Sequence, residues 1–210
     1  MCTMQSIIKN IEGSARYLES NLWDKWMNVE TRHSDGLNKM TQGKKGDSLP
    51  FQTSAHYTIR KAIKLIQSKC DDTVIELGCG KGRAVCHFAR LRLKKVIGIE
   101  ISTELSEIAK KNARQLRGRR APIEIRNMDV LSADFSEGSI FYMFNPFGEK
   151  TLRAVLSKIE LSHKEIRKQA TIVYINPLFS NIFNDFPWLE KTQDVRIYGS
   201  LRTMIYTTKY

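Results

Sequence analysis

Three glycines at alternate positions, Gly78, Gly80 and Gly82, are the residues of this chain best suited to hold a ligand. They directly follow an apolar, partly β-branched segment, residues 73–77, and a helical spacing of apolar residues covers 81–93. Glycine has no Cβ and adopts positive φ without strain, so a ligand can approach the backbone closely. A glycine turn that leads from a buried strand into a helix N-terminus is typical of nucleotide-binding sites. The stretch therefore predicts a strand, a ligand-binding turn and a helix.

The spacing of these glycines disfavours a dinucleotide as the ligand. The dinucleotide fingerprint is G-x-G-x-x-G, and its third glycine would fall at the position of Arg83. Here the glycines are spaced G-x-G-x-G, and Glu76 lies two residues before the first of them. A tight turn without any ligand is the alternative interpretation.

Polar residues follow the next predicted strands, where they could reach the same ligand. The apolar strand 95–100 ends in Glu100, and Asp129 comes shortly after the alternating strand 123–126. A carboxylate at the end of the second strand of a Rossmann-like unit accepts hydrogen bonds from ribose hydroxyls. Asn145 follows a further apolar strand. Right-handed crossovers between parallel strands would bring all these residues and the glycine turn to one edge of a sheet.

The elements that must position these residues alternate along the chain. Strand and helix patterns alternate up to the buried strand 170–177. The last two strand patterns, 195–198 and 204–207, flank a turn and indicate an antiparallel hairpin. This order predicts an α/β fold: a mainly parallel sheet with helices on both faces and a C-terminal antiparallel hairpin.

Residues 1–50 predict a helical arm and a loop ahead of the main domain, residues 51–210. Apolar residues at spacings of three and four form one helical stripe, which needs a surface to bury against. The polar, glycine-containing segment 32–48 indicates a loop. Ser54 is the expected N-cap of the next helix, which runs to about Lys69. The stripe consists of Met4, Ile7, Ile8, Ile11, Ala15, Leu18, Leu22 and Trp26.

The composition excludes several classes of protein. The 210 residues are 41% hydrophobic and 27% charged, which is typical of a soluble globular domain. No apolar run reaches membrane-spanning length and the N-terminus lacks the layout of a signal peptide, so a cytoplasmic location and no membrane partner are expected. The four cysteines form no C-x-x-C pair and no histidine accompanies them at ligand spacing, so reduced thiols and no metal are expected.

The net charge of +12 suits an acidic partner such as RNA. Much of the excess lies between residues 81 and 126 and includes Arg117, Arg119 and Arg120. A solvated basic surface without such a partner is the alternative. These arginines follow a helix that runs away from the carboxyl edge of the sheet, so we expect them on the side opposite the ligand site.

The glycine stretch, E-L-G-C-G-K-G-R, resembles motif I of the class I S-adenosylmethionine-dependent methyltransferases, written (D/E)-x-G-x-G-x-G. The resemblance implies their seven-stranded Rossmann-like methyltransferase sheet and S-adenosyl-L-methionine as the cofactor. Glu100 would then bind the ribose and Asp129 the adenine amino group, with an apolar neighbour of Asp129 flanking the ring. Glu76 would orient the loop or the cofactor amine, and Tyr57 would contact the methionine end unless it is a core tyrosine. The implied cofactor-binding residues are Tyr57, Glu76, Gly78, Cys79, Gly80, Gly82, Glu100, Ile101, Met128, Asp129, Val130 and Asn145.

The segment N-P-F-G resembles motif IV of the amino-methylating branch of this class, written (D/N/S)-P-P-(Y/F). The resemblance implies that the Asn145 side chain and the backbone carbonyl after it accept hydrogen bonds from a target amine, while Phe147 stacks on the plane of that amine. Phe147 directly follows Pro146, so the second proline of the pattern is missing, which disfavours a nucleobase as the target. A strand-terminating turn is the alternative. The implied catalytic residues are Asn145, Pro146 and Phe147.

The N-P-F-G segment and residues 23–31, W-D-K-W-M-N-V-E-T, resemble a group of small bacterial class I methyltransferases with an F-D-x-x-x-G-V-D-T-like segment before the core. This resemblance covers most of the chain and implies a fold and a cofactor but no target. In this class an N-terminal extension often closes over the cofactor, so the arm is expected to be a lid or, alternatively, a packing arm.

Three interpretations of the function are open at this stage. The first is an N-methyltransferase that acts on a protein or an RNA, favoured by Asn145 and the basic surface. The second is a small-molecule methyltransferase whose aromatic-rich arm closes a pocket. The third is a cofactor-binding partner protein without catalysis. The sequence indicates neither the methyl acceptor nor the oligomeric state.

Overall fold

Most of the chain is described by the computed structural model. Three predicted features lie wholly or partly outside the described residues: the stripe ahead of residue 17, most of the loop 32–48, and the turn of the C-terminal hairpin. The described residues are 17–32, 47, 49, 52–164, 167–197 and 201–209.

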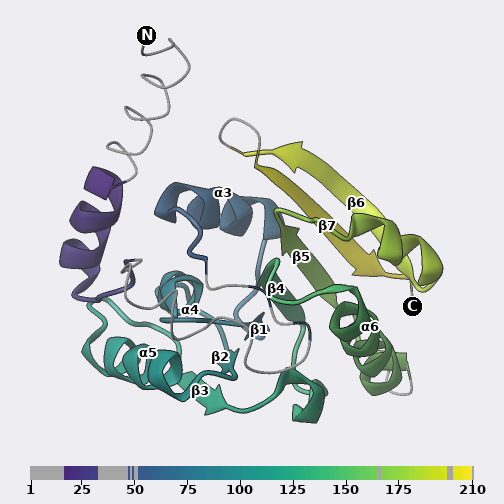
Figure 1. Ribbon diagram of the computed structural model, residues 1–210, viewed down its shortest axis with the longest axis horizontal. Coiled ribbons are helices and arrows are strands. Elements are labelled where there is room, and N and C mark those ends of the chain that lie inside the picture. The colour runs from purple at the N-terminus through teal and green to yellow at the C-terminus, as the bar shows by residue number, and fades with distance from the viewer. Residues whose placement is uncertain are drawn as a thin grey trace, which may run out of the picture.

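A seven-stranded mixed sheet forms the centre of the protein (Figure 1). Its strands are β1 (Thr73–Leu77), β2 (Lys95–Glu100), β3 (Ile123–Asn127), β4 (Ile140–Phe144), β5 (Thr171–Ile175), β6 (Leu189–Arg196) and β7 (Arg202–Thr208). The strand order is β3-β2-β1-β4-β5-β7-β6. The first five strands pair in parallel, whereas β7 is antiparallel to both β5 and β6. The predicted seven-stranded α/β fold with its C-terminal antiparallel hairpin is confirmed.

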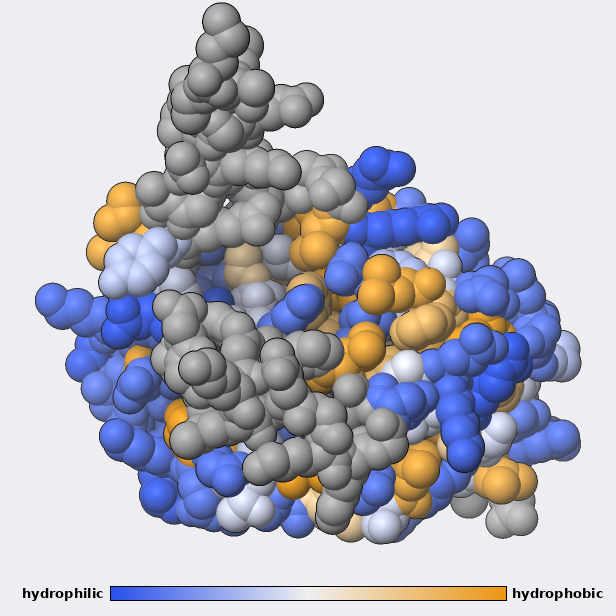
Figure 2. Space-filling model, in the orientation of Figure 1, coloured by the Kyte–Doolittle hydropathy of each residue, from blue (hydrophilic) through white to orange (hydrophobic). Residues whose placement is uncertain are grey.

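Helices cover both faces of this sheet. They are a helix over residues 17–27, α3 (His56–Ile66), α4 (Arg83–Phe88), α5 (Thr103–Gln115) and α6 (Glu149–Lys164), with the 3₁₀ segments η1 (Val130–Ser132) and η2 (Ser180–Asp185). Figure 1 shows α6 apart from the other four helices. On the surface in Figure 2, apolar side chains gather near the middle of the view and hydrophilic side chains surround them.

Burial on both faces explains why the central strands are apolar throughout. All five residues of β1 are buried. Side chains alternate between the two faces of a strand, and Ile75 packs in one core cluster with Leu152 of α6, whereas Val74 packs in a second cluster with Phe88 of α4. For this reason, the sequences of parallel strands that are covered on both faces are continuous hydrophobic runs.

Two helices differ from the prediction. The helix expected over 81–93 begins only at Arg83, because the three glycines need a longer turn, and ends at Phe88. The residues after it turn to bury Leu93, which is 6% exposed. The helix expected from Ser54 to about Lys69 spans His56–Ile66, and its N-cap is Ala55, which makes no capping hydrogen bond with its side chain.

The N-terminal helix does not bury the apolar stripe that the sequence predicts for it. Leu18, Leu22 and Trp26 are 60%, 68% and 49% exposed. The opposite side of the helix is buried instead, with Asp24 and Met27 at 4% and 0% exposure. The expectation that this stripe packs on the domain is wrong for residues 17–27, because hydrogen bonds described below hold the polar side of the helix against the domain.

Gly98 of β2 leaves the space in which the glycine turn packs. A Cβ at this position would lie 2.8 Å from Cys79 Sγ and 2.9 Å from Val85 Cγ2. We predict that Gly98→Ala lowers the free energy of unfolding by about 1–3 kcal/mol, because overpacking forces neighbouring groups to move. Urea denaturation measures this difference. Ser157→Ala on the exposed side of α6 is the control and should stay within about 0.5 kcal/mol of the unmodified protein; equal effects would contradict the prediction.

Candidate active site

The glycine turn after β1 has the backbone geometry that its glycines permit. Gly78, Gly80 and Gly82 all have positive φ, at 72°, 54° and 79°. The backbone N–H groups of Gly78 and Cys79 both donate to the Ile99 carbonyl of β2, at 3.0 and 2.9 Å. The turn is therefore fixed to the neighbouring strand, and side chains at its glycines would be strained.

The acid before the glycine turn supports the turn from within the protein. Glu76 Oε2 accepts a hydrogen bond from the Val85 N–H at the start of α4, at 2.8 Å. Burial raises the pKa of Glu76 well above its usual value, and the nearby charge of Glu100 raises it further. Of the two roles predicted for Glu76, this contact favours orienting the loop.

Glu100 joins the ends of two elements at the carboxyl edge of the sheet. Its Oε2 accepts from the Gly80 N–H at 2.8 Å, and its Oε1 accepts from the Ser102 N–H at 2.9 Å. Burial raises the pKa of this carboxyl group. Each carboxylate oxygen has a second acceptor position, so Glu100 can hold its loop and still accept hydrogen bonds from a ligand's hydroxyl groups.

The residues after β3 lie beside Glu100. The Met128 N–H donates to the Glu100 carbonyl at 3.0 Å. Met128 and Val130 are partly buried against the core. Asp129 accepts a hydrogen bond from the Leu131 N–H at 2.9 Å and so caps η1. The loop that carries Ile101 is tied to β3 through the Asn127 side-chain amide, which donates to the Ile101 carbonyl at 3.2 Å.

The segment after β4 contacts the glycine turn directly. A Cβ on Gly78 would lie 2.5 Å from Cβ of Pro146. Asn145 adopts a positive φ of 44° and is 8% exposed, and its Oδ1 accepts a hydrogen bond from the Tyr174 hydroxyl at 2.7 Å. Phe147 is 6% exposed and belongs to the core. The buried position of Phe147 does not favour the predicted stacking on a target amine.

The structure thus brings most of the predicted site residues to one edge of the sheet. The turn after β1, the end of β2, the residues after β3 and those after β4 are joined by the contacts just described. Tyr57, at the start of α3, is 38% exposed, and its N–H donates to Glu19 of the N-terminal helix at 2.6 Å. This carboxylate, rather than the predicted Ser54 side chain, accepts at the first turn of α3.

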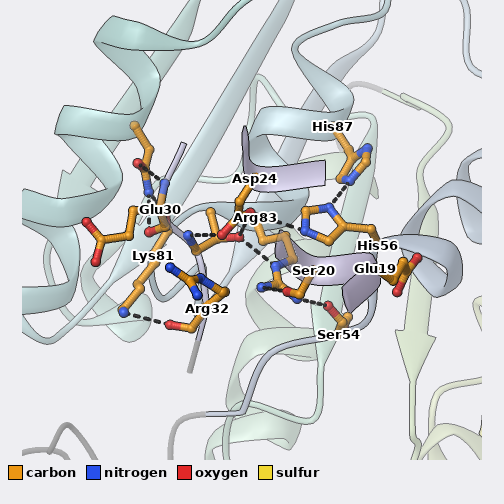
Figure 3. Close-up of polar contacts among 12 residues, drawn as sticks. Glu19, Ser20, Asp24, Glu30, Arg32, Ser54, His56, Lys81, Arg83 and His87 are labelled. Carbon is orange, nitrogen blue, oxygen red and sulfur yellow. Dashed lines mark hydrogen bonds and ion pairs between the residues drawn. The ribbon is translucent and has the colours of Figure 1, made fainter. Parts of the chain in front are cut away.

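A buried polar cluster that the sequence did not reveal holds the N-terminal segment against the glycine turn (Figure 3). The Arg83 guanidinium donates to Thr31 Oγ1 and Ser20 Oγ, both at 2.7 Å, and to the Ser54 carbonyl at 2.9 Å. Asp24 accepts from the Thr31 N–H at 2.7 Å and from its hydroxyl at 2.6 Å. Arg83, the residue that replaces the third glycine of a dinucleotide fingerprint, therefore binds the arm.

Further contacts extend this attachment to the glycine turn itself. Lys81 Nζ donates to the Arg32 carbonyl at 2.7 Å. The Asn112 side chain on α5 accepts from the Glu30 N–H at 2.8 Å and donates to the Lys81 carbonyl at 2.9 Å. Residues 17–32 of the predicted arm are thus hydrogen-bonded to the turn expected to hold the cofactor.

Two more residues of the predicted arm contact the segment after β4. The Gly148 N–H donates to the Asp47 carbonyl at 2.8 Å, and Asp47 Oδ2 accepts from the Thr151 N–H at 3.1 Å. The Leu49 N–H donates to the Pro146 carbonyl at 3.1 Å. The described residues of segment 1–50 therefore contact both turns of the candidate site. No local sequence pattern predicts these pairs, since about a hundred residues separate some of the partners.

An Asp-His-His chain continues the buried cluster. His56 Nε2 lies 3.2 Å from Asp24 Oδ1, and His56 Nδ1 lies 2.7 Å from His87 Nε2 (Figure 3). Although burial raises the pKa of Asp24, the contacts with His56 and Thr31 outweigh it and lower that pKa. Burial lowers the pKa of His56 despite Asp24, and it lowers the pKa of His87 well below the usual value. Both imidazoles are therefore neutral near pH 7, with one donating to the other.

The architecture and this site define the class I methyltransferase fold, and comparison with known proteins agrees. Residues 74–168 match the methyltransferase domain family. A protein-lysine N-methyltransferase of Saccharolobus islandicus is 28% identical over 97 residues, which cover 46% of this chain and 60% of that protein. The match thus spans less than two thirds of the curated relative's length.

Solved structures show the same fold. An RNA methyltransferase from Salinibacter ruber, in complex with S-adenosyl-L-homocysteine, has a TM-score of 0.53 at 20% identity, over 75% of this chain and 92% of that one. A ribosomal protein L11 methylase from Lactobacillus delbrueckii subsp. bulgaricus has a TM-score of 0.59 at 16% identity, over 76% and 81%. Together with the family match, these findings support an S-adenosylmethionine-dependent methyltransferase. The narrower N-P-F-G group stays a prediction.

Within the described part of the chain, no helix combines the length and the apolar character needed to cross a bilayer. Among the same residues, no three His, Cys, Asp or Glu side chains gather as ligands for a metal ion.

The neutral imidazole pair predicts how stability depends on pH. Because the pKa values of both histidines are lower in the folded protein than the unfolded value of about 6.5, the unfolded chain binds more protons below that pH. The two histidines should therefore make the free energy of unfolding fall as the pH is lowered from about 6.5 towards their folded pKa values, whereas Glu76 and Glu100, whose pKa values are raised, act in the opposite direction. In His87→Gln, whose side-chain amide can still donate to His56, this fall should be smaller. Urea unfolding between pH 7.5 and 5 measures it.

The control for this prediction is Ser157→Ala, which should keep the unmodified protein's dependence on pH. An identical pH dependence in His87→Gln would show that other groups, such as the carboxylates, cause the loss of stability in acid.

Proposed function

We propose that this chain is an S-adenosyl-L-methionine-dependent N-methyltransferase that acts on a lysine amine of a protein. The observation that carries the proposal is the contact between Gly78 and Pro146, which puts an Asn-Pro segment of the amino-methylating type beside a methyltransferase glycine turn. The relative named a protein-lysine N-methyltransferase supports the choice of a protein amine.

The residues at the carboxyl edge fit the proposed cofactor. Glu100 has acceptor positions left for the ribose hydroxyls, beside the backbone of the glycine turn. Asp129 and its apolar neighbours Met128 and Val130 follow β3, the strand beside β2, and are suited to bind the adenine. Cys79 lies in the glycine turn and Ile101 directly follows β2, so both lie beside the proposed cofactor. Tyr57 is assigned to the methionine end of the cofactor.

S-adenosyl-L-methionine would supply a methyl group attached to a sulfonium. The acceptor nitrogen would bond to the methyl carbon while the carbon–sulfur bond breaks and its electron pair stays on sulfur. The methylated nitrogen would then lose a proton to water. Because the methyl group is already activated, the protein mainly holds the acceptor in line. The Asn145 side chain and the carbonyl of Pro146, which also accepts from the Leu49 N–H, accept hydrogen bonds from the neutral amine. Because a lysine amine is mostly protonated near pH 7, it first loses a proton to water. The neutral amine that results needs no strong general base.

The position of the arginine cluster argues against RNA as the acceptor. The cluster lies between the end of α5 and the start of β3, which is the amino edge of the sheet, opposite Asn145. The Arg117 N–H donates to the Met27 carbonyl at 2.8 Å, and the Arg120 N–H to the Ala89 carbonyl at 2.8 Å. This segment therefore helps to hold the N-terminal helix.

Cofactor binding is the first test of the proposal. Calorimetric titration should show binding of S-adenosylhomocysteine and none of NAD. Glu100→Ala should weaken binding by about 2–4 kcal/mol, since two hydrogen bonds to a charged acceptor are lost. Glu107→Ala, an exposed acid on α5, is the matched control and should bind like the unmodified protein. Binding of NAD alone, or equal affinities for both variants, would contradict the assignment.

Methyl transfer is the second test. Labelled S-adenosyl-L-methionine is supplied with three acceptor pools: cellular protein, total RNA and a metabolite filtrate. We expect label in protein, recovered as methylated lysine after hydrolysis. Asn145→Gly, which keeps a residue suited to positive φ, should lower labelling at least about tenfold while the affinity for S-adenosylhomocysteine changes less than about threefold.

Gln67→Gly is the control for that substitution, because Gln67 is an exposed amide side chain at a positive φ of 51°, remote from the site. It should label protein like the unmodified chain. Label confined to RNA or to metabolites would replace the proposed acceptor. Parallel losses of labelling and cofactor affinity in Asn145→Gly would make Asn145 a cofactor or structural residue.

A further inference from the structure

The end of β5 repeats the Asn-Pro turn of β4. Asn145 and Asn176 each follow a strand and precede a proline, and they have positive φ values of 44° and 51°. Phe144 pairs with Ile175 in the parallel register of the two strands. The two asparagines are therefore neighbours at the carboxyl edge, on strands spaced about 5 Å apart.

Both turns hold a non-glycine residue in a costly conformation. Positive φ is sterically unfavourable for an L-residue, although asparagine tolerates it better than most. Such strain persists where the surrounding structure enforces it, commonly at functional sites. At Asn176 the backbone N–H donates to the Arg202 carbonyl of β7 at 2.8 Å, which fixes the turn.

Tyr174 connects the two turns. Its hydroxyl donates to Asn145 Oδ1 at 2.7 Å and lies 3.5 Å from the Phe179 N–H, which donates to it. Burial raises the pKa of Tyr174 to about 12, so the hydroxyl keeps its proton. The Asn145 amide is thereby oriented: one acceptor position of Oδ1 is occupied by Tyr174, and the other is left for a ligand.

The Asn176 turn has features that suit a lysine side chain. The Asn176 side chain is half-buried, and none of its polar atoms is hydrogen-bonded to another described residue. Leu178, two residues later, is 62% exposed. An amide oxygen accepts hydrogen bonds from an amine, and an exposed leucine suits the methylene stem of a lysine.

We propose that the end of β5 completes the methyl-acceptor site: Tyr174 is a positioning residue that fixes the Asn145 amide, and Asn176 contacts the acceptor amine. This inference rests on the proposed lysine N-methyltransferase. The inference adds Asn176 and an apolar contact with Leu178 to the proposed acceptor site. Together these two residues favour an amine on an aliphatic stem over a flat aromatic acceptor.

The kinetic test uses substitutions that remove only the groups in question. Tyr174→Phe removes the hydroxyl and keeps the ring that packs 5.8 Å from Phe183. We expect protein labelling to fall about three- to tenfold, the loss typical of one hydrogen bond, with unchanged affinity for S-adenosylhomocysteine. In an Asn145→Gly background, Tyr174→Phe should cause almost no further loss. Additive losses would mean that Tyr174 does not act through Asn145.

Tyr206→Phe is the matched control for the tyrosine. Tyr206 is a buried tyrosine on β7 whose hydroxyl donates to Met204 Sδ at 3.2 Å. A merely structural role of Tyr174 would make both variants lose stability and activity alike. Asn176→Gly, compatible with positive φ, should raise the KM for the protein acceptor about threefold or more at unchanged cofactor affinity, whereas Gln67→Gly should not.

A second measurement separates this inference from the proposed function. In ¹⁵N-labelled protein saturated with S-adenosylhomocysteine, titration with N-acetyl-lysine methylamide should shift the side-chain amide signals of Asn145 and Asn176, which the Gly variants assign. Tyr174→Phe should shift the Asn145 signal before any probe is added. If the unmodified protein transfers no methyl group, the proposed function fails. If it transfers methyl groups but Tyr174→Phe and Asn176→Gly match their controls, or if the amide signals do not shift, the inference is overturned.

Discussion

The close contact between two turns, one after β1 and one after β4, is the constraint on which the site depends. A Cβ on Gly78 would overlap Pro146, so only glycine allows the two turns to touch. The proposed cofactor side of the site, where Glu100 accepts from the Gly80 N–H, and the proposed acceptor side, with Asn145, are thereby held in one arrangement. A methyl transfer needs this kind of fixed alignment, because its rate depends on how the nucleophile is directed.

Local patterns allowed the sheet, the glycine turn and the strand-end residues to be predicted from the sequence. Glu100 and Asn145 were selected because Glu100 ends one apolar strand and Asn145 directly follows another, and parallel topology brings strand ends together. The buried cluster was not predicted, since Asp24 and Arg83 have no spacing in common and meet only after folding. Ser54 was expected to cap α3, yet Glu19, from a distant segment, accepts the hydrogen bond there. The apolar stripe of the N-terminal helix was assigned to the wrong side because tertiary hydrogen bonds overrode its periodicity.

The attachment of the arm rests on polar contacts rather than on apolar burial. Inside the protein, the Thr31 hydroxyl accepts a hydrogen bond from Arg83 and donates one to Asp24. A member of such a buried network that lost its partner would be strongly destabilising. A polar network also accepts only one geometry, unlike an apolar surface on which a helix can slide. The cluster therefore fixes the register in which residues 17–32 lie along the glycine turn, and this holds whether or not the arm acts as a lid.

The long sequence separations of these contacts have a consequence for how the protein folds. Residues 17–32 leave the ribosome before Arg83, Asn112 and Arg117, their partners, are synthesised. Contacts between residues so far apart form slowly, because a long loop must close before they stabilise anything. The N-terminal helix should accordingly dock late, after the first three strands have paired. Until then its polar side, which is buried in the folded protein, faces water together with the apolar stripe that stays exposed, so chaperones and proteases can reach the whole segment during synthesis.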